Sequence, residues 1–158
     1  MGNFNSVMEI YTALNLASIT RLRAAWKGVP QRYQSKLAEL GVLLAPYLNY
    51  KNYRAAIENH APPIIPIQGI LLQDLTFLEE NADTIPAPNG PEGEEWINFS
   101  KMSLIGKSLW TIAQFQSRPF LFNEVPVIRD YLLNPSIILD EKELYLGSKN
   151  CEPSTRNN

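Results

Sequence analysis

Apolar residues recur at intervals of three and four along most of this chain, a spacing that places them on one face of a helix. The first set predicts a helix from about residue 5 to 15 and consists of Phe4, Val7, Met8, Tyr11 and Leu14. The same spacing, bounded by proline and glycine, predicts further helices. Their ranges are about 18–28, 30–44, 50–59 and 127–133, with a last helix opening at the acidic residues 140–143.

The central segment of the chain predicts a helical hairpin. Its first part, PIQGILLQDLTFLEE (66–80), is apolar on more than one face, which is typical of a helix enclosed by others. Residues 98–116 carry one apolar stripe at helical spacing. Residues 81–95 hold three prolines and two glycines, so no regular element is expected there and we predict an exposed loop. We therefore expect an all-α fold with a hairpin from Ile70 to Gln116.

Length and composition exclude several classes of function. A chain of 158 residues predicts about one domain, and its net charge of −2 gives no basic footprint for nucleic acid. With one cysteine, Cys151, and one histidine, His60, neither an intrachain disulfide nor a His/Cys metal cluster is expected. The start MGNFNSVMEI lacks a leader pattern, and no apolar run is long enough to cross a membrane. We expect a cytoplasmic protein without stable membrane insertion.

Three short motifs have a simple structural interpretation beside a functional one. Residues 106–108, Gly-Lys-Ser, resemble the end of a phosphate-binding loop, but Lys101 stands where that loop needs glycine, which favours a solvated helix surface. Asn98 begins a glycosylation pattern and equally suits a helix cap. The start of the chain fits N-myristoylation of Gly2, although Phe4 belongs to the first helical stripe.

Seven segments, in order, carry a family resemblance. They are NFNSVMEIYTALN (3–15), ITRL (19–22), YKNYR (50–54), PPIIPIQGILLQDLTFLEE (62–80), INFSK (97–101), IAQFQSRPF (112–120) and DEKELYLGSKNCEP (140–153). Together they resemble the catalytic domain of Ras-type guanine-nucleotide exchange factors. The resemblance implies a multi-helix orthogonal bundle with a protruding hairpin, of which this chain is the C-terminal two thirds, the N-terminal helices being missing. Residues 1–150 would form this partial domain and 151–158 a loose tail.

The resemblance also implies a function. Such a domain binds a Ras-family small GTPase and accelerates GDP release without covalent chemistry, so neither a cofactor nor a bond-making enzyme is expected. The family's hairpin enters beside the nucleotide, where a carboxylate repels phosphate. Thr76 and Glu80 are four residues apart, so both lie on one face near a helix end.

Individual roles follow from matching positions of this sequence to the family's motifs. Thr76 corresponds to a side chain close to the magnesium site, and Glu80 to the acidic residue that approaches the phosphate-binding loop. The remaining matches are to GTPase-binding positions: Asn15 for a contact with the second switch, Met8, Tyr50 and Ile67 for its apolar receptacle, and Lys101 at the end of INFSK. The family's asparagine contact with the first switch is either lost here or shifted to Asn81.

Two departures from the family pattern keep a second hypothesis open. Asn81, Ala82 and Asp83 stand where the family commonly has glycine, asparagine and proline, and residues 102–104 lack the usual basic side chains. The alternative to an exchange factor is a non-catalytic GTPase-binding module or an inactive truncated fragment.

Overall fold

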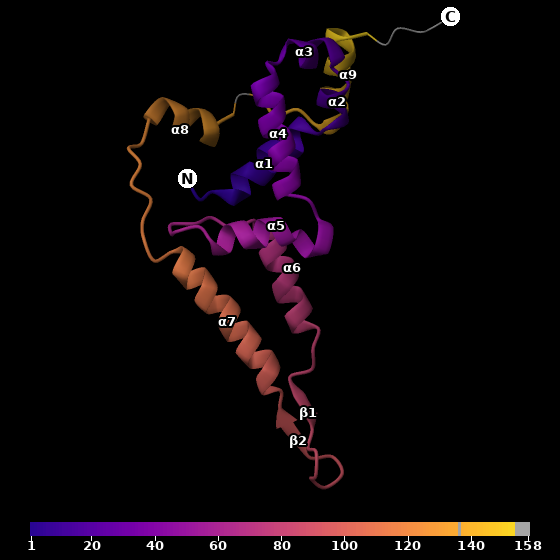
Figure 1. Ribbon diagram of the computed structural model, residues 1–158. Coiled ribbons are helices and arrows are strands. Elements are labelled where there is room, and N and C mark those ends of the chain that lie inside the picture. Colours follow the sequence, from indigo (N-terminus) through magenta and orange to yellow (C-terminus); the bar gives the residue numbers. More distant parts are fainter. Residues whose placement is uncertain (136, 154–158) are drawn as a thin grey trace, which may run out of the picture. The chain divides into compact units, whose positions relative to one another are not determined.

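The computed structural model describes residues 1–135 and 137–153, and Figure 1 traces the chain. Its elements are α1 (Phe4–Leu14), α2 (Ala17–Thr20), α3 (Arg23–Gly28), α4 (Gln31–Leu43), α5 (Tyr47–Glu58), α6 (Gln68–Glu79), β1 (Thr84–Pro86), β2 (Glu95–Ile97), α7 (Phe99–Phe115), α8 (Pro126–Leu133) and α9 (Glu141–Cys151). This architecture confirms the predicted all-α class. In the described residues, no helix combines the length and the hydropathy needed to cross a bilayer.

The chain folds as two compact units. The first comprises residues 1–5 and 57–120 and contains the hairpin formed by α6, β1, β2 and α7. The second comprises residues 6–56 and 121–158 and contains α2, α3, α4, α8, α9 and most of α1 and α5.

Apolar residues at the base of the hairpin form the core of the first unit. Its buried hydrophobic residues are Phe4, Ile57, Ile64, Ile67 and Ile70. Backbone bonds reinforce this base, because the Ile64 amide donates to the Phe115 carbonyl at 3.0 Å and the Phe4 amide donates to the Ile65 carbonyl at 2.9 Å. The end of α7 is thus tied to the segment that precedes α6.

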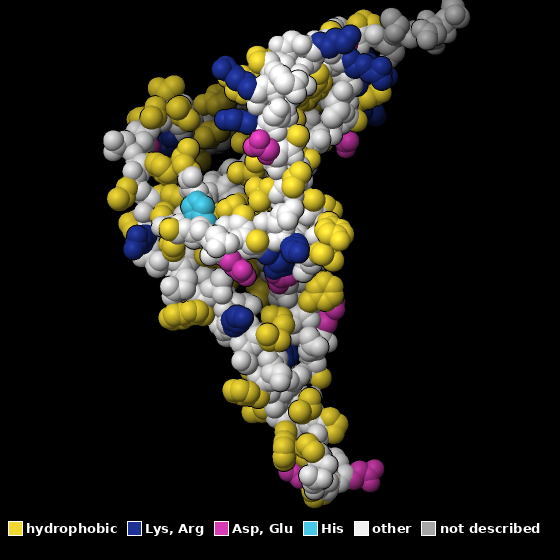
Figure 2. Space-filling model, in the orientation of Figure 1, with side chains coloured by type: hydrophobic (Ala, Val, Ile, Leu, Met, Phe, Trp, Pro, Cys, Tyr) yellow, Lys and Arg dark blue, Asp and Glu magenta, His cyan; other side chains and the backbone are white. Residues whose placement is uncertain are grey.

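The hairpin helices form where the sequence predicts them, but α6 is not enclosed. Leu72 and Phe77 are each 62% exposed, and Ile70 is the buried residue of the helix. The expectation of an enclosed helix is wrong because α6 packs mainly against one neighbour, α7. Figure 2 shows hydrophobic side chains on the surface of this hairpin.

The expected loop between the hairpin helices contains a two-stranded antiparallel ribbon. Strands β1 and β2 pair Thr84 with Ile97, Ile85 with Trp96 and Pro86 with Glu95. The expectation that proline and glycine exclude a regular element is wrong, because most of them fall in the connection 87–94. The flanking residues include threonine, isoleucine and tryptophan, which favour strands.

In the second unit, the helix expected over 18–28 is divided into α2 and α3. The Arg21 guanidinium leaves this segment and donates to the Ser148 carbonyl of α9 and, at 2.8 Å, to the Glu152 carbonyl. The Glu152 carboxylate in turn accepts from the Ala24 and Ala25 amides, each at 3.0 Å. Leu22, which precedes α3, has no polar side chain to cap the helix, so Glu152 satisfies amides that the local sequence leaves unpaired.

Helix α9 begins as predicted and extends further than expected. Asp140 accepts from the Glu143 amide at 2.8 Å, and Glu143 accepts from the Asp140 amide at 2.9 Å, which is a complete capping box. The helix continues through Cys151, and Glu152 is hydrogen-bonded, so the expected loose tail does not begin at residue 151. Residues 154–158 of that tail lie outside the described residues.

Gly2 occupies a position that requires glycine. It is buried with a φ of 68°, and an added Cβ would collide with the Pro63 carbonyl oxygen. The first unit therefore gives this glycine a structural role.

We expect Gly2→Ala to lower the free energy of unfolding by more than about 1 kcal/mol, because the side chain meets both strain and collision. Gly106→Ala is the matched control. A Cβ at Gly106 of α7 meets open space, and alanine favours a helix by about 0.5–1 kcal/mol. Thermal unfolding followed by circular dichroism should show opposite shifts. Equal shifts would contradict the assigned role of Gly2.

Lowering the pH should weaken the hydrogen bonds between Glu152, which follows α9, and the start of α3. Hydrogen bonds from the backbone amides of Ala25 and Ala24 hold the pKa of Glu152 below its ordinary value of 4.5. A lowered pKa in the folded state means that the carboxylate stabilises the fold above its ordinary pKa and loses this effect as the pH falls through the lowered pKa.

This pH dependence can be measured by melting the protein between about pH 7 and about pH 3. Glu152→Gln should reduce the loss of stability on acidification, whereas Glu39→Gln, an exposed position on α4, should leave it unchanged. Identical acid profiles for wild type and Glu152→Gln would contradict the interpretation.

Candidate functional site

The acidic end of α6 brings two of the predicted site residues to the surface. The Glu80 amide donates to the Thr76 carbonyl at 3.1 Å, so the two residues are one helical turn apart. Both are exposed, and the Thr76 hydroxyl donates to the Leu72 carbonyl at 2.9 Å. The predicted spacing therefore places a hydroxyl and a carboxylate near each other where α6 ends.

Lys101 lies inside the hairpin rather than on its surface. Its side chain is 3% exposed, and its ammonium donates to the Glu79 carbonyl at 3.2 Å, the Asn81 carbonyl at 2.7 Å and Asp83 Oδ1 at 2.6 Å. The Glu79 carboxylate is 3.8 Å away. In this conformation Lys101 connects α7 to the turn after α6, and its burial does not fit the direct contact with a partner that the sequence suggested.

Asn98 makes a second connection between the same two segments. Its side-chain oxygen accepts from the Lys101 amide at 3.1 Å, which confirms the prediction of a helix cap. Its side-chain amide donates to the Ala82 carbonyl at 2.9 Å, and its backbone amide donates to the Asp83 carbonyl at 2.7 Å. We call Asn98 and Lys101, with the carbonyls and carboxylate they bind in residues 79–83, the polar clasp.

Asn81 is exposed beside Glu80 but uses its side chain locally. Its amide group donates to the Phe77 carbonyl at 2.9 Å, one turn back in α6. The last carbonyls of a helix have no partner within the helix, and this bond satisfies one of them. Asn81 thus helps to end α6 at the point where Glu80 is presented.

The other predicted site residues are distributed between the two units. Ile67 precedes α6 in the first unit and is buried, so it belongs to the hydrophobic core. Met8 and Tyr50 are half-buried in the second unit, and Tyr50 has a left-handed φ of 58°. Asn15 follows α1, is exposed, and donates from its side chain to the Tyr11 carbonyl at 2.8 Å. The structure therefore groups Thr76, Glu80, Asn81 and Lys101 where α6 ends and α7 begins, and it places Met8, Asn15 and Tyr50 in the second unit.

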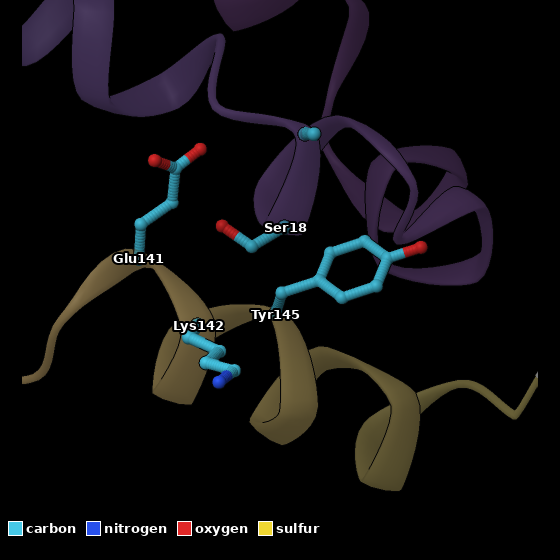
Figure 3. Close-up of a pocket in the computed structure, with 5 residues that line it drawn as sticks. Ser18, Glu141, Lys142 and Tyr145 are labelled. Carbon is cyan, nitrogen blue, oxygen red and sulfur yellow. The ribbon is translucent and has the colours of Figure 1, made fainter.

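A separate pocket in the second unit has no recognisable catalytic arrangement. Figure 3 shows Ser18 of α2 facing Glu141 and Tyr145 of α9, with Lys142 directed away from Ser18. A nucleophilic serine needs an adjacent base, and the residues that line this pocket include no histidine. In residues 1–135 and 137–153, no three His, Cys, Asp or Glu side chains are grouped to hold a metal.

The exposed carboxylate at the end of α6 can act on a bound ligand through electrostatic interactions, without covalent chemistry. An exposed carboxylate can repel phosphate or accept hydrogen bonds from groups that held it. Comparison with known protein families gives a match: the model of the RasGEF domain matches residues 1–103. The chain belongs to the RasGEF domain family.

Curated relatives match almost the whole RasGEF chain. "Ras guanine nucleotide exchange factor Y" of Dictyostelium discoideum is 39% identical over 153 residues, 97% of this chain and 10% of the relative. "Ras-specific guanine nucleotide-releasing factor 2" of Danio rerio is 36% identical over 97% of this chain and 12% of the relative. "Ras-specific guanine nucleotide-releasing factor 1" of Mus musculus has the same identity and coverage. This chain therefore spans a small part of the length of these relatives.

The sequence did not predict that Asn98 and Lys101, in the INFSK segment of this RasGEF chain, bind the turn after α6. Sequence reasoning assigned Asn98 a local cap and Lys101 a place at the binding surface, and it treated Asp83 as a departure from the family pattern. The contacts that unite these residues cross 15 to 22 positions of sequence, so helical periodicity could not reveal them. The one local signal was the i, i+3 spacing of Asn98 and Lys101 at a helix start.

Asn98 variants can separate the helix cap from the connection to α6. Asn98→Ala removes the cap and the side-chain bond to Ala82, and it should destabilise the protein by about 1 kcal/mol, the usual cost of losing an N-cap. Asn98→Asp keeps an oxygen that caps α7 but removes the donor to Ala82, so its melting temperature should stay closer to that of the wild type. Equal melting temperatures for Asn98→Ala and wild type would contradict the cap.

Proposed function

We propose that this RasGEF chain promotes the release of GDP from a Ras-family small GTPase, with the end of α6 acting beside the nucleotide. The observation that carries the proposal is the exposed Glu80 at the end of α6. It lies in a hairpin whose second helix is hydrogen-bonded to the segment before α6, through Phe115, and to the turn after α6, through Lys101. The activity needs no covalent step and no cofactor, so the chain is an exchange factor rather than a bond-making enzyme.

An exposed carboxylate whose backbone is held by hydrogen bonds suits this task physically. To shorten the lifetime of a bound nucleotide about 10⁴-fold, the barrier to release must fall by about 5.5 kcal/mol. An exchange factor that prefers the empty GTPase weakens the binding of nucleotide. The nucleotide weakens the binding of the exchange factor by the same ratio. A carboxylate held at the phosphate site supplies such a preference, because its repulsion of phosphate disappears when the nucleotide leaves.

The other site residues receive proposed roles on the same basis. Asn15 contacts the second switch, Met8 and Tyr50 contribute to the apolar receptacle, and Thr76 lies close to the magnesium site. Ile67 is buried, so its contribution to the receptacle is support of α6 from the core. Asn81 reaches the first switch, and Lys101 contributes through the hairpin rather than by direct contact.

We further propose that the chain represents the C-terminal two thirds of the family's catalytic domain and works in the cytoplasm, brought to membranes by its GTPase. The order of the seven resembling segments supports this placement. Helix α8 is consistent with it, since Val127, Ile128, Leu132 and Leu133 are exposed apolar residues of the kind that neighbouring helices cover.

A second candidate is binding of the GTPase without exchange. It is favoured by the departure from the family at 81–83 and by the Asn81 amide, which bonds to Phe77 within its own helix end. In that case the chain would bind a GTPase and leave the rate of GDP release unchanged.

Release of a fluorescent GDP analogue from several Ras-family GTPases distinguishes these candidates. We expect acceleration by the wild type, and a roughly 100-fold lower acceleration when Glu80→Ala is combined with Asn15→Ala, which corresponds to about 2.7 kcal/mol of lost transition-state stabilisation. Glu39→Ala on α4 removes one exposed carboxylate elsewhere and should retain full activity. Measurable binding of the wild type without acceleration would contradict the exchange function and support the second candidate.

A further inference from the structure

We propose that Lys101 and Asn98 are positioning residues that hold the acidic end of α6 in the conformation needed for nucleotide release. This inference rests on the proposed exchange function and adds to it a cause for the geometry of Glu80. It is carried by the polar clasp, whose contacts lie wholly within the first unit.

The end of α6 is electrostatically unfavourable without a nearby cation. The carboxyl end of a helix carries partial negative charge on its unpaired carbonyls, so acidic side chains there are destabilising. Helix α6 nevertheless ends in Glu79 and Glu80, and Asp83 follows within the same turn. The ammonium of Lys101 places one positive charge among these groups.

Lys101 binds the backbone of the residues on both sides of Glu80. An ammonium has three donors, and here the three bind Glu79 O, Asn81 O and Asp83 Oδ1. Glu80 is thus flanked by two anchored carbonyls while its own side chain remains exposed. Fixing the backbone before and after one residue fixes the direction in which its side chain leaves.

Asn98 fixes the rest of the same turn from the rigid start of α7. Its side chain binds Ala82 O, and its backbone amide binds Asp83 O. Its side-chain oxygen also caps the helix on which Lys101 stands. The two residues therefore transmit the position of α7 to residues 79–83.

Burial distinguishes positioning from direct binding. With a side chain 3% exposed and all three donors used, Lys101 would have to leave its acceptors before it could bind a GTPase. Its removal should therefore act on the rate at which bound GTPase loses nucleotide rather than on affinity.

The test uses Lys101→Met, which keeps an unbranched, flexible side chain one atom shorter and removes the ammonium. We expect the maximal rate of GDP release, kcat, to fall roughly tenfold or more, and the apparent KM for the GDP-bound GTPase to change less than about threefold. Lys107→Met makes the same substitution at an exposed position of α7 and should change neither quantity. A large rise in KM with unchanged kcat would overturn the proposal in favour of direct binding.

A double-mutant cycle tests whether Lys101 acts through Glu80. If it does, Lys101→Met should have little further effect on kcat in a Glu80→Ala background, whereas independent roles would multiply the two fold-changes. Asp83→Ala is a milder variant, because Asp83 is exposed and its loss removes a single partner of the ammonium. It should lower kcat in the same direction with the melting temperature retained, and multiplicative effects with Glu80→Ala would overturn the proposal.

Hydrogen exchange of the isolated chain separates failure of this inference from failure of the proposed function. In Lys101→Met and Asp83→Ala, the Glu80 and Asn81 amides, which donate to the Thr76 and Leu78 carbonyls, should exchange faster while those in the middle of α7 stay protected. Unchanged protection of the Glu80 and Asn81 amides in both variants would overturn the positioning role, whatever the activity. Faster exchange of these two amides in the variants, together with a wild type that does not accelerate GDP release, would instead refute the exchange function and leave the polar clasp as a structural feature.

Discussion

The buried ammonium of Lys101 offsets the negative charge that gathers at the end of α6. The carbonyls of Glu79 and Asn81 and the carboxylate of Asp83 converge on Lys101, which neutralises part of the negative charge that the helix end accumulates. Each of these acceptors lies in the turn that presents Glu80. The candidate site therefore depends on a charge contributed by α7, and the hairpin is the unit that must remain intact for the site to exist.

Local signals predicted most helices of this fold. The Asp140–Glu143 capping box, the Asn98 cap and the apolar stripes are all encoded within a few residues, and the structure confirms each of them. The same locality explains why the sequence alone could place Thr76 and Glu80 one turn apart. Their roles toward a GTPase came from family resemblance, because spacing alone describes an ordinary helix end.

Contacts between distant residues explain what the sequence did not predict. The break between α2 and α3 depends on Arg21 and Glu152, which are 131 positions apart, and the burial of Lys101 depends on how α7 aligns with α6. Periodicity reports which face of a helix is apolar but not how many neighbours cover it, so the exposure of Leu72 and Phe77 was missed. The ribbon was missed because its proline and glycine residues were counted across the whole segment rather than by position.

Two adjacent glutamates with the same chemistry have different surroundings. The Glu79 carbonyl binds the Lys101 ammonium, and its carboxylate lies 3.8 Å from it, whereas Glu80 presents an exposed side chain one residue later. If only the stability of the helix mattered, its last turn would carry basic residues. Here the turn carries acidic residues instead, and a lysine of the neighbouring helix offsets their charge, which costs local stability. Such conflicts with local stability are expected at functional sites. The polar clasp makes this conflict tolerable, since it neutralises the backbone of the turn without covering the carboxylate that the proposed activity requires.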